Sequence, residues 1–242
     1  TVTNPGGHSS RPRSDNAIYE LSAALLKLAD HKFAVQATPL TRSYFAALGQ
    51  SVPGELGDAM RAFAENPEDP AAVATLQSNP ETVGTLGTTC VATMLRGGHA
   101  ENALPQRATA NVNCRIFPGH SIESIRDELA TVIGDPGVTI TQLPPKRPTP
   151  PQPPLDPKII GPMEKLVARY WPGLMVIPSM ANGYTDATFL GAAGIPTYGI
   201  PGIWGDPDGN GVHGLNERIE VKSLYVGRDF MFDLVKAYAS KP

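Results

Sequence analysis

The sequence predicts a mixed α/β chain, with an α+β domain of ferredoxin-like βαββαβ order in its first part and α/β alternation in its last part. Three observations predict this class. Residues 109–116 alternate strictly between apolar and polar side chains, as a half-buried strand does. Stretches with helical periodicity lie on both sides of that strand. A proline-rich segment at 144–157 then separates the two parts.

Two helices of the first part are predicted from apolar residues at the spacing of one helical face. The first can begin after Ser14, a residue type that caps helices, and its apolar positions are Ile18, Leu21, Leu25 and Leu28. The second can begin after Ser121, and its apolar positions are Ile122, Ile125, Leu129 and Val132. Both helices should bury a single face.

Three strands accompany these helices, at residues 88–95, 109–116 and 138–143. With a strand remnant at the start of the chain, the order becomes strand, helix, strand, strand, helix, strand. This is the split-βαβ order, which forms an antiparallel sheet with helices on one face. Residues 46–82 contain several prolines between short helical stretches, so they read as a helical insertion into this plan.

The segment at 144–157 is predicted to be an extended connector, since eight of its fourteen residues are proline. We place the domain boundary there. A docking motif for a proline-binding partner is the alternative. Structured segments on both sides of the connector make that alternative weaker.

The part after the connector alternates between helices and short apolar segments. Helices are predicted at 158–170, 186–193 and 221–238, with an apolar run at 174–178 and a strand through Tyr198 and Ile200. Two strands are too few for a closed domain, because central strands normally have neighbours on both edges. We therefore expect this part to lack some of its strands.

Composition excludes several classes of function. The net charge is −3 and no basic cluster occurs, which argues against a nucleic-acid surface. No run of 18 apolar residues and no signal peptide occurs, so we expect a soluble protein and no membrane span, with the compartment undecided. The first residue is Thr1 rather than Met, so we expect residues upstream. Cys90 and Cys114 have no motif spacing and are interpreted as small buried hydrophobic residues.

Five histidines are present, but no two have the spacing that makes a metal site readable from sequence. His213 lies between Gly211 and Gly214, in a loop just before the last helix. A single histidine in a loop is most often simply solvated. The glycines favour a functional role, because they allow the backbone to pass close to another group.

The same loop also fits a calcium-binding pattern, through Asp206, Asp208, Asn210, Gly211 and Glu217. An EF-hand requires an entering helix, which the prolines and glycines of residues 196–205 exclude. Calcium is therefore the weaker of the two interpretations.

Arg115 and His8 are further candidates. Arg115 projects from the polar face of a predicted strand, which could aim its guanidinium at a carboxylate, or it is a surface residue paired with a nearby acid. His8 lies in a Gly-Gly-His-Ser-Ser loop, which could present its imidazole or could be a simple turn. Neither residue decides the function by itself.

Taken together, these segments resemble the dinuclear zinc amidohydrolases that have a lid domain, a family of carboxypeptidases, aminoacylases, desuccinylases and dipeptidases. The resemblance covers nearly the whole chain and keeps the order of its motifs. Those motifs are Gly6-Gly7-His8-Ser9-Ser10, Gly97-Gly98-His99-Ala100-Glu101-Asn102 followed by Arg115, Gly183-Tyr184-Thr185-Asp186, and His213-Gly214-Leu215-Asn216-Glu217.

The resemblance implies a lid or dimerisation domain at 1–143 and a C-terminal portion of a catalytic domain at 158–242. It implies that His213 is a zinc ligand, and that His8 reaches across a homodimer to stabilise the oxyanion. Asn102 and Arg115 would hold the substrate, with Gly183 and Thr185 lining the cleft. The substrate would be a small peptide or an N-acyl amino acid with a free carboxylate, and each full-length subunit would bind two zinc ions.

The chain departs from the family pattern in one respect. The remaining zinc ligands and the catalytic Glu of the family lie before the lid, and this sequence contains none of those motifs. We therefore expect the 242-residue chain to be inactive and a longer parent to be active. The alternative is a dimerisation or binding module without catalysis.

Overall fold

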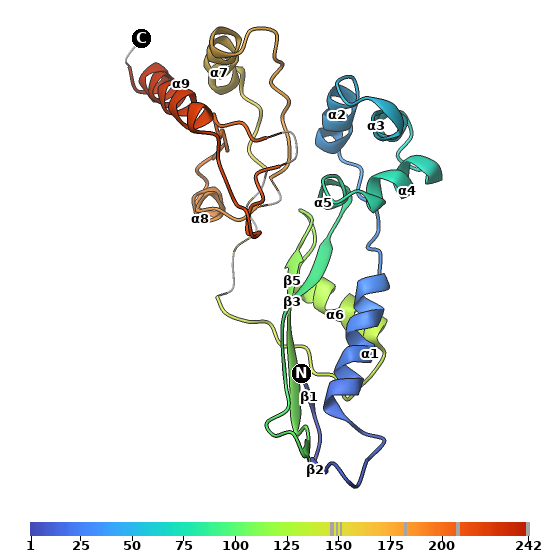
Figure 1. Cartoon of the computed structure of the whole chain (residues 1–242). Coiled ribbons are helices and arrows are strands. Elements are labelled where there is room, and N and C mark those ends of the chain that lie inside the picture. The colour runs from blue at the N-terminus through green and yellow to red at the C-terminus, as the bar shows by residue number, and fades with distance from the viewer. Residues whose placement is uncertain (146–147, 149, 151, 182, 207–208, 241–242) are drawn as a thin grey trace. The chain divides into compact units, whose positions relative to one another are not determined.

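The computed structural model describes residues 1–145, 148, 150, 152–181, 183–206 and 209–240 (Figure 1). The chain divides into two compact units, unit 1 from Thr1 to Lys146 and unit 2 from Arg147 to Pro242. Several prolines of the connector are described, whereas Pro151 lies outside the described residues. Within those residues, no helix has the length and apolar character that crossing a membrane requires.

The centre of unit 1 is an antiparallel sheet in the order β1 (Val2–Thr3), β5 (Arg107–Arg115), β3 (Thr89–Gly97). β3 and β5 form a long hairpin that pairs Thr89 with Arg115 at one end and Gly97 with Ala108 at the other. A second, two-stranded sheet joins β2 (Gly7–His8) to β4 (Ala103–Leu104). The alternation of apolar residues along β5 is the reason that this strand can bury one face.

Two helices, α1 (Ala17–Asp30) and α6 (Ile122–Ile133), cover the same side of the sheet (Figure 1). Ser121 caps α6 as predicted, since its side chain accepts the backbone N–H of Ser124 at 3.0 Å. The predicted cap Ser14 is wrong. Asn16 takes that place and accepts the N–H of Ile18 at 3.0 Å, because its amide oxygen lies where the first turn leaves donors unpaired.

The predicted strand at 138–143 does not form as a regular element. One residue of it pairs with the start of the chain, since Thr1 and Thr139 exchange two backbone hydrogen bonds of 2.9 and 2.8 Å. This exchange is typical of an antiparallel pair. Because β1 has only two residues, it offers the segment little to pair with. The order from Thr139 through β1 and β5 to β3 is the ferredoxin-like order, so the predicted α+β class is confirmed.

Four helices are inserted between α1 and β3, and they build a hydrophobic core of their own. They are α2 (Pro39–Leu48), α3 (Gly54–Glu65), α4 (Pro70–Ser78) and α5 (Val83–Leu86). The insertion therefore begins before and ends after the predicted range of 46–82. Its largest buried side chains are Phe45, Met60, Phe63, Leu76 and Leu86.

The two cysteines form a disulfide, which corrects their interpretation as unbonded hydrophobic residues. Cys90 of β3 and Cys114 of β5 lie directly opposite each other, with Cα atoms 4.1 Å apart. Their spacing along the sequence gives no sign of this. Only the register of the hairpin brings the two sulfur atoms together.

Unit 2 contains the helices α7 (Pro157–Tyr170), α8 (Ala187–Ala192) and α9 (Val221–Ala239). Its buried core consists of Met163, Phe230 and Leu234. In the described part of this unit no strand occurs, so the predicted strand through Tyr198 and Ile200 is wrong. A strand gains its hydrogen bonds from neighbours, and the described residues supply none here.

Candidate functional site

His8 and Asn102 are brought together by the small sheet of β2 and β4. His8 pairs with Ala103, and the backbone N–H of Ser9 donates to the carbonyl oxygen of Asn102 at 2.9 Å. The side chains of His8 and Asn102 are both exposed. Two residues separated by more than ninety positions thus become neighbours, on a backbone that strand pairing holds in place.

The path of the chain into β2 requires glycine. Gly6 has a φ of +74°, and a Cβ atom on it would lie 2.6 Å from the Cγ atom of Gln106. Just before it, Asn4 donates its backbone N–H to the carbonyl oxygen of Gln106 at 2.9 Å and its side-chain N–H to Glu20 at 3.2 Å. These contacts fix the segment before His8 against the start of β5 and α1.

The ring of His8 is held by the residue two positions later. Its Nδ1 atom lies 2.8 Å from the hydroxyl oxygen of Ser10 and 3.2 Å from the backbone nitrogen of Ser10. The turn is closed by the N–H of Arg11, which donates to the carbonyl oxygen of His8 at 2.9 Å. The sequence motif indicates a role for His8 and none for Ser10. The sequence signal for this contact is a Ser two residues after a His, a spacing at which a turn can bring the hydroxyl to the ring.

Arg115 lies at the opposite end of the hairpin from the β2–β4 pair (Figure 1). Seven residue steps separate Ala108 from Arg115 along β5, a span of roughly 23 Å at the usual rise of a strand. Arg115 is exposed. The structure therefore separates Arg115 from His8 and Asn102 within one chain, and the three cannot contact one small substrate together.

Gly183 and Thr185 are exposed in the loop before α8. The hydroxyl oxygen of Thr185 accepts the backbone N–H of Ala187 at 3.2 Å, which supports the first turn of that helix. The ring of the intervening Tyr184 packs edge-on against Phe189, with centroids 6.2 Å apart. The loop is thus tied to α8 by local contacts.

His213 lies at the tip of an exposed loop with an unusual backbone. Among the described non-glycine residues, it alone has a positive φ, of 60°. Its N–H donates to a carboxylate oxygen of Glu217 at 3.1 Å, and the N–H of Gly214 donates to the carbonyl oxygen of Gly211 at 2.7 Å. The backbone of Glu217 also lies close to Gly211. The loop therefore turns sharply around His213, and the imidazole is exposed to solvent.

The base of this loop is closed by Arg218. Its guanidinium lies 2.7 Å from a carboxylate oxygen of Asp206, and its backbone N–H donates to the carbonyl oxygen of Asn210 at 2.9 Å. Asp206 and Glu217, two of the calcium pattern's residues, thus have protein partners, and no helix precedes the loop within the described residues from 194. Asp208 lies outside the described residues. This geometry does not support an EF-hand.

No group of three or more His, Cys, Asp or Glu side chains that could hold a metal ion occurs in the described ranges. His213 offers one imidazole, and a zinc site requires at least three protein ligands. The described residues therefore do not by themselves fit a complete zinc site.

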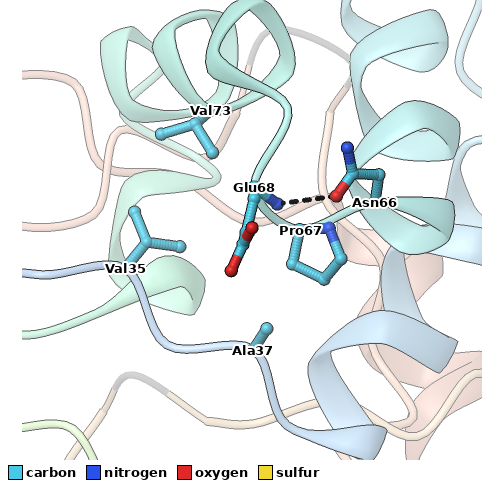
Figure 2. A pocket seen from close by; sticks show the side chains of 6 residues that line it. All are labelled: Val35, Ala37, Asn66, Pro67, Glu68 and Val73. Carbon is cyan, nitrogen blue, oxygen red and sulfur yellow. Dashed lines mark hydrogen bonds between the residues drawn. The ribbon is translucent and has the colours of Figure 1, made fainter.

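A pocket of about 570 Å³ lies in the helical insertion of unit 1, and Figure 2 shows its walls. The carboxylate of Glu68 points into the space between two apolar sides. None of the predicted site residues lines this pocket, whose lining residues are Val35, Ala37, Asn66, Pro67, Glu68 and Val73.

The sequence matches a known protein family and several curated proteins. Residues 1–140 match the family model described as peptidase dimerisation domain. The chain is 27% identical over 240 residues to a probable carboxypeptidase S-like 2 of Dictyostelium discoideum, covering 98% of this chain and 45% of that protein. It is 26% identical over 245 residues to the human N-fatty-acyl-amino acid synthase/hydrolase PM20D1, covering 97% of this chain and 47% of that protein. The chain thus spans about half the length of the curated relatives it matches.

A solved structure has the same fold. It is the M20 family metallo-carboxypeptidase Sso-CP2 from Sulfolobus solfataricus, with a TM-score of 0.62 and 16% sequence identity. The likeness covers 98% of this chain and 56% of that one.

Proposed function

Because the chain belongs to the M20 peptidase family through its dimerisation domain, we propose that it is the lid and part of the catalytic domain of a zinc-dependent amidohydrolase. The reaction would be hydrolysis of a peptide or N-acyl amide bond in a substrate with a free carboxylate. The observation that carries this proposal is the pairing of β2 with β4, which holds His8 beside Asn102 on an exposed surface. We propose that residues 1–143 form the lid domain and that residues 158–242 form the portion of the catalytic domain.

His8 would stabilise the scissile carbonyl as it becomes an oxyanion. Its imidazole is exposed and Nδ1 faces Ser10, so the other side of the ring is available to a substrate. The exposed carboxamide of Asn102 can donate two further hydrogen bonds near by. Donors held ready where charge develops lower the barrier without having to reorganise.

His213 would supply one ligand to the metal site. Its backbone is held in the left-handed region by Glu217, and its side chain is free to reach a cation outside the loop. Zinc, when bound, would activate water and polarise the substrate carbonyl. The other ligands would come from a segment that precedes the lid, and Gly183 and Thr185 would line the cleft.

Arg115 would bind the carboxylate of the substrate, and the separation within one chain implies two copies. β3 is an edge strand whose outer side pairs with no strand among the described residues. Antiparallel pairing of two β3 edges about a twofold axis would set the Arg115 end of one copy beside the β2–β4 end of the other. His8 and Asn102 of one copy would then serve the substrate that Arg115 of the other copy holds.

Exposed apolar side chains support this dimer. Val91 and Leu95 of β3 are 61% and 63% exposed, and Tyr19 of α1 is 72% exposed. Edge strands with such surfaces seek partners. A Val91→Lys substitution should raise the dissociation constant of the dimer, measured by sedimentation, at least about tenfold, since it puts a charge at the edge of the sheet. Leu174→Lys, at a site in unit 2 that is 65% exposed, is the matched control and should leave the dimer unchanged.

Zinc content and amide hydrolysis test the activity. We expect the 242-residue chain to bind no stoichiometric zinc and to hydrolyse neither an N-oleoyl amino acid nor a dipeptide. A longer polypeptide that includes the segment before the lid should do both. Blocking the carboxylate of the substrate as an amide should lower kcat/KM on the order of 100-fold, because Arg115 would lose a charge-assisted bidentate partner.

Two results would reject the proposal. Stoichiometric zinc with turnover in the 242-residue chain alone would contradict the assignment of missing ligands. A longer polypeptide that dimerises but neither binds zinc nor hydrolyses any of these substrates would favour a dimerisation or binding module without catalysis.

A further inference from the structure

The loop after β2 fixes Ser10 against one nitrogen of the His8 ring. The turn from His8 to Arg11 is closed by a backbone hydrogen bond of 2.9 Å, and Ser9 is tied to Asn102 by another of 2.9 Å. Between these two anchors, both the N–H and the hydroxyl of Ser10 face Nδ1 of His8, at 3.2 and 2.8 Å. The contact is thus held by backbone bonds on both sides.

These two contacts distinguish the tautomers of the neutral ring. A hydroxyl can donate or accept, so the contact with Oγ fits a proton on either nitrogen. A backbone N–H can only donate, so the contact with the Ser10 nitrogen requires Nδ1 to be the acceptor. A proton on Nδ1 would face that N–H directly and would leave it without an acceptor.

We infer that Ser10 is a positioning residue that holds neutral His8 as the tautomer with its proton on Nε2. This inference rests on the proposed function for its catalytic meaning. Nε2 has no hydrogen-bond partner within the described residues, and the His8 side chain is exposed. The ring therefore presents a donor outward, which is the group that a carbonyl oxygen gaining negative charge requires.

The other tautomer would present a lone pair at the same place and would repel the developing oxyanion. The serine thus contributes to the reaction through His8, without touching the substrate. Ser9 provides a matched comparison, since it is the adjacent serine and only its backbone takes part in the turn's hydrogen bonds.

Nitrogen NMR of the 242-residue chain, labelled at histidine, tests the inference without metal or substrate. At about pH 8, where an ordinary imidazole is neutral, His8 should show Nδ1 as the unprotonated nitrogen and Nε2 as the protonated one. His8→Gln identifies its signals among those of the five histidines. A protonated Nδ1 in the unaltered chain overturns the inference, and this result needs no variant at Ser10.

Two substitutions refine the result. Ser10→Ala keeps the N–H and should keep the tautomer, whereas Ser10→Pro removes the N–H and should allow both tautomers. Ser9→Ala should leave the His8 signals unchanged. Identical His8 signals in Ser10→Pro and the unaltered chain would show that the N–H does not select the tautomer.

Activity in the longer polypeptide separates this inference from the proposed function. Ser10→Ala should keep the tautomer but lower kcat about fivefold with little change in KM, because the His8 ring loses the hydrogen bond to the Ser10 hydroxyl that helps to orient it. Ser9→Ala should change neither kcat nor KM. If the NMR result holds while Ser10→Ala and His8→Ala leave kcat unchanged, the catalytic role of His8 fails and the tautomer assignment stands. If kcat falls but Nδ1 carries the proton, the tautomer assignment fails and the role of His8 stands.

Discussion

The strand pair that carries His8 and the loop that carries His213 hold their imidazoles by different means. His8 lies in β2, where backbone hydrogen bonds to β4 and the register with Ala103 set its position. His213 lies in a loop with a positive φ, which a carboxylate of Glu217 and an ion pair between Asp206 and Arg218 stabilise. The first position depends on backbone pairing and the second on side-chain contacts.

The units that carry the two residues also differ in how much of their apolar surface is buried. Unit 1 has a sheet covered by two helices and a second core in its helical insertion. Unit 2 buries Met163, Phe230 and Leu234 but leaves large apolar side chains exposed, among them Phe232 at 69%. The position of His8 should therefore persist in the chain by itself, whereas the His213 loop should become fully ordered only when further ligands and strands are present.

The largest effect should come from breaking the core of unit 2, the unit that carries the His213 loop. Phe230 is 1% exposed, and Phe230→Ala should destabilise unit 2 by about 3–5 kcal/mol through a cavity in its core. Phe232→Ala, in the same helix, should change stability by less than about 0.5 kcal/mol. Urea unfolding followed by tryptophan fluorescence measures both, since both tryptophans lie in unit 2. Equal effects of the two variants would mean that unit 2 has no core of its own.

A mixing experiment asks whether the two histidines of one site come from two copies. In the longer polypeptide, His8→Ala should lower kcat about 100- to 1000-fold, as loss of an oxyanion donor does, and His213→Ala should abolish metal-dependent turnover. Mixing the two variants after dissociation should restore roughly a quarter of the activity, because half of the dimers are mixed and each has one complete site. No recovery in verified mixed dimers would place both histidines in the same copy's site.

The disulfide of unit 1 offers a test on the His8 side of the comparison. Replacing both cysteines by serine should cost about 2–4 kcal/mol, since Cys90 and Cys114 close a loop with a sequence separation of 24. The measurement is urea unfolding of unit 1, with reduction of the unaltered chain as the parallel case. The His8 signals in NMR should not change. The disulfide lies near the Thr89–Arg115 end of the hairpin, whereas β2 pairs with β4 beyond its other end. Shifted His8 signals would argue that the whole hairpin sets its position.

A smaller effect is expected at the His213 loop. Glu217→Ala removes the acceptor of the His213 N–H and should speed exchange of that amide about five- to tenfold, the effect of about 1 kcal/mol. Global stability should stay within about 0.5 kcal/mol, since the loop is exposed. Amide exchange by NMR gives both quantities. An unchanged exchange rate would show that Glu217 does not hold the loop.

The smallest effect concerns the segment that follows His8. A side-chain hydrogen bond from Arg13 lowers the pKa of Asp15 below its ordinary value of 3.8. At pH values between the folded pKa and 3.8, the Asp15 carboxyl binds more protons in the unfolded chain than in the folded one. The contribution of this ion pair to stability is therefore present above pH 3.8 and is lost as the pH falls through the folded pKa. A carbon NMR titration of Asp15 should show the lowered pKa, and Arg13→Gln should return it to its ordinary range. An unchanged pKa in that variant would contradict the pairing.

Local patterns predicted the elements that depend on their own residues. The hairpin strands, the Ser121 cap of α6 and the helices α7 and α9 follow from periodicity and capping chemistry. The predicted cap of α1, Ser14, lies two residues before the observed cap, Asn16, because both residue types cap helices well and their local chemistry does not choose between them. The strand at Tyr198 failed for another reason, since a strand requires a neighbour that no local pattern specifies.

The sequence by itself determined the α+β class, the order of the motifs and the residue types that could do chemistry, because periodicity and residue type are local properties. Only the tertiary structure decided which of those residues meet. Strand register placed Cys90 opposite Cys114 and His8 beside Asn102, and it set Arg115 at the far end of the hairpin. Register is a relation between distant segments that forms when backbone groups pair, so no single stretch of the sequence contains it.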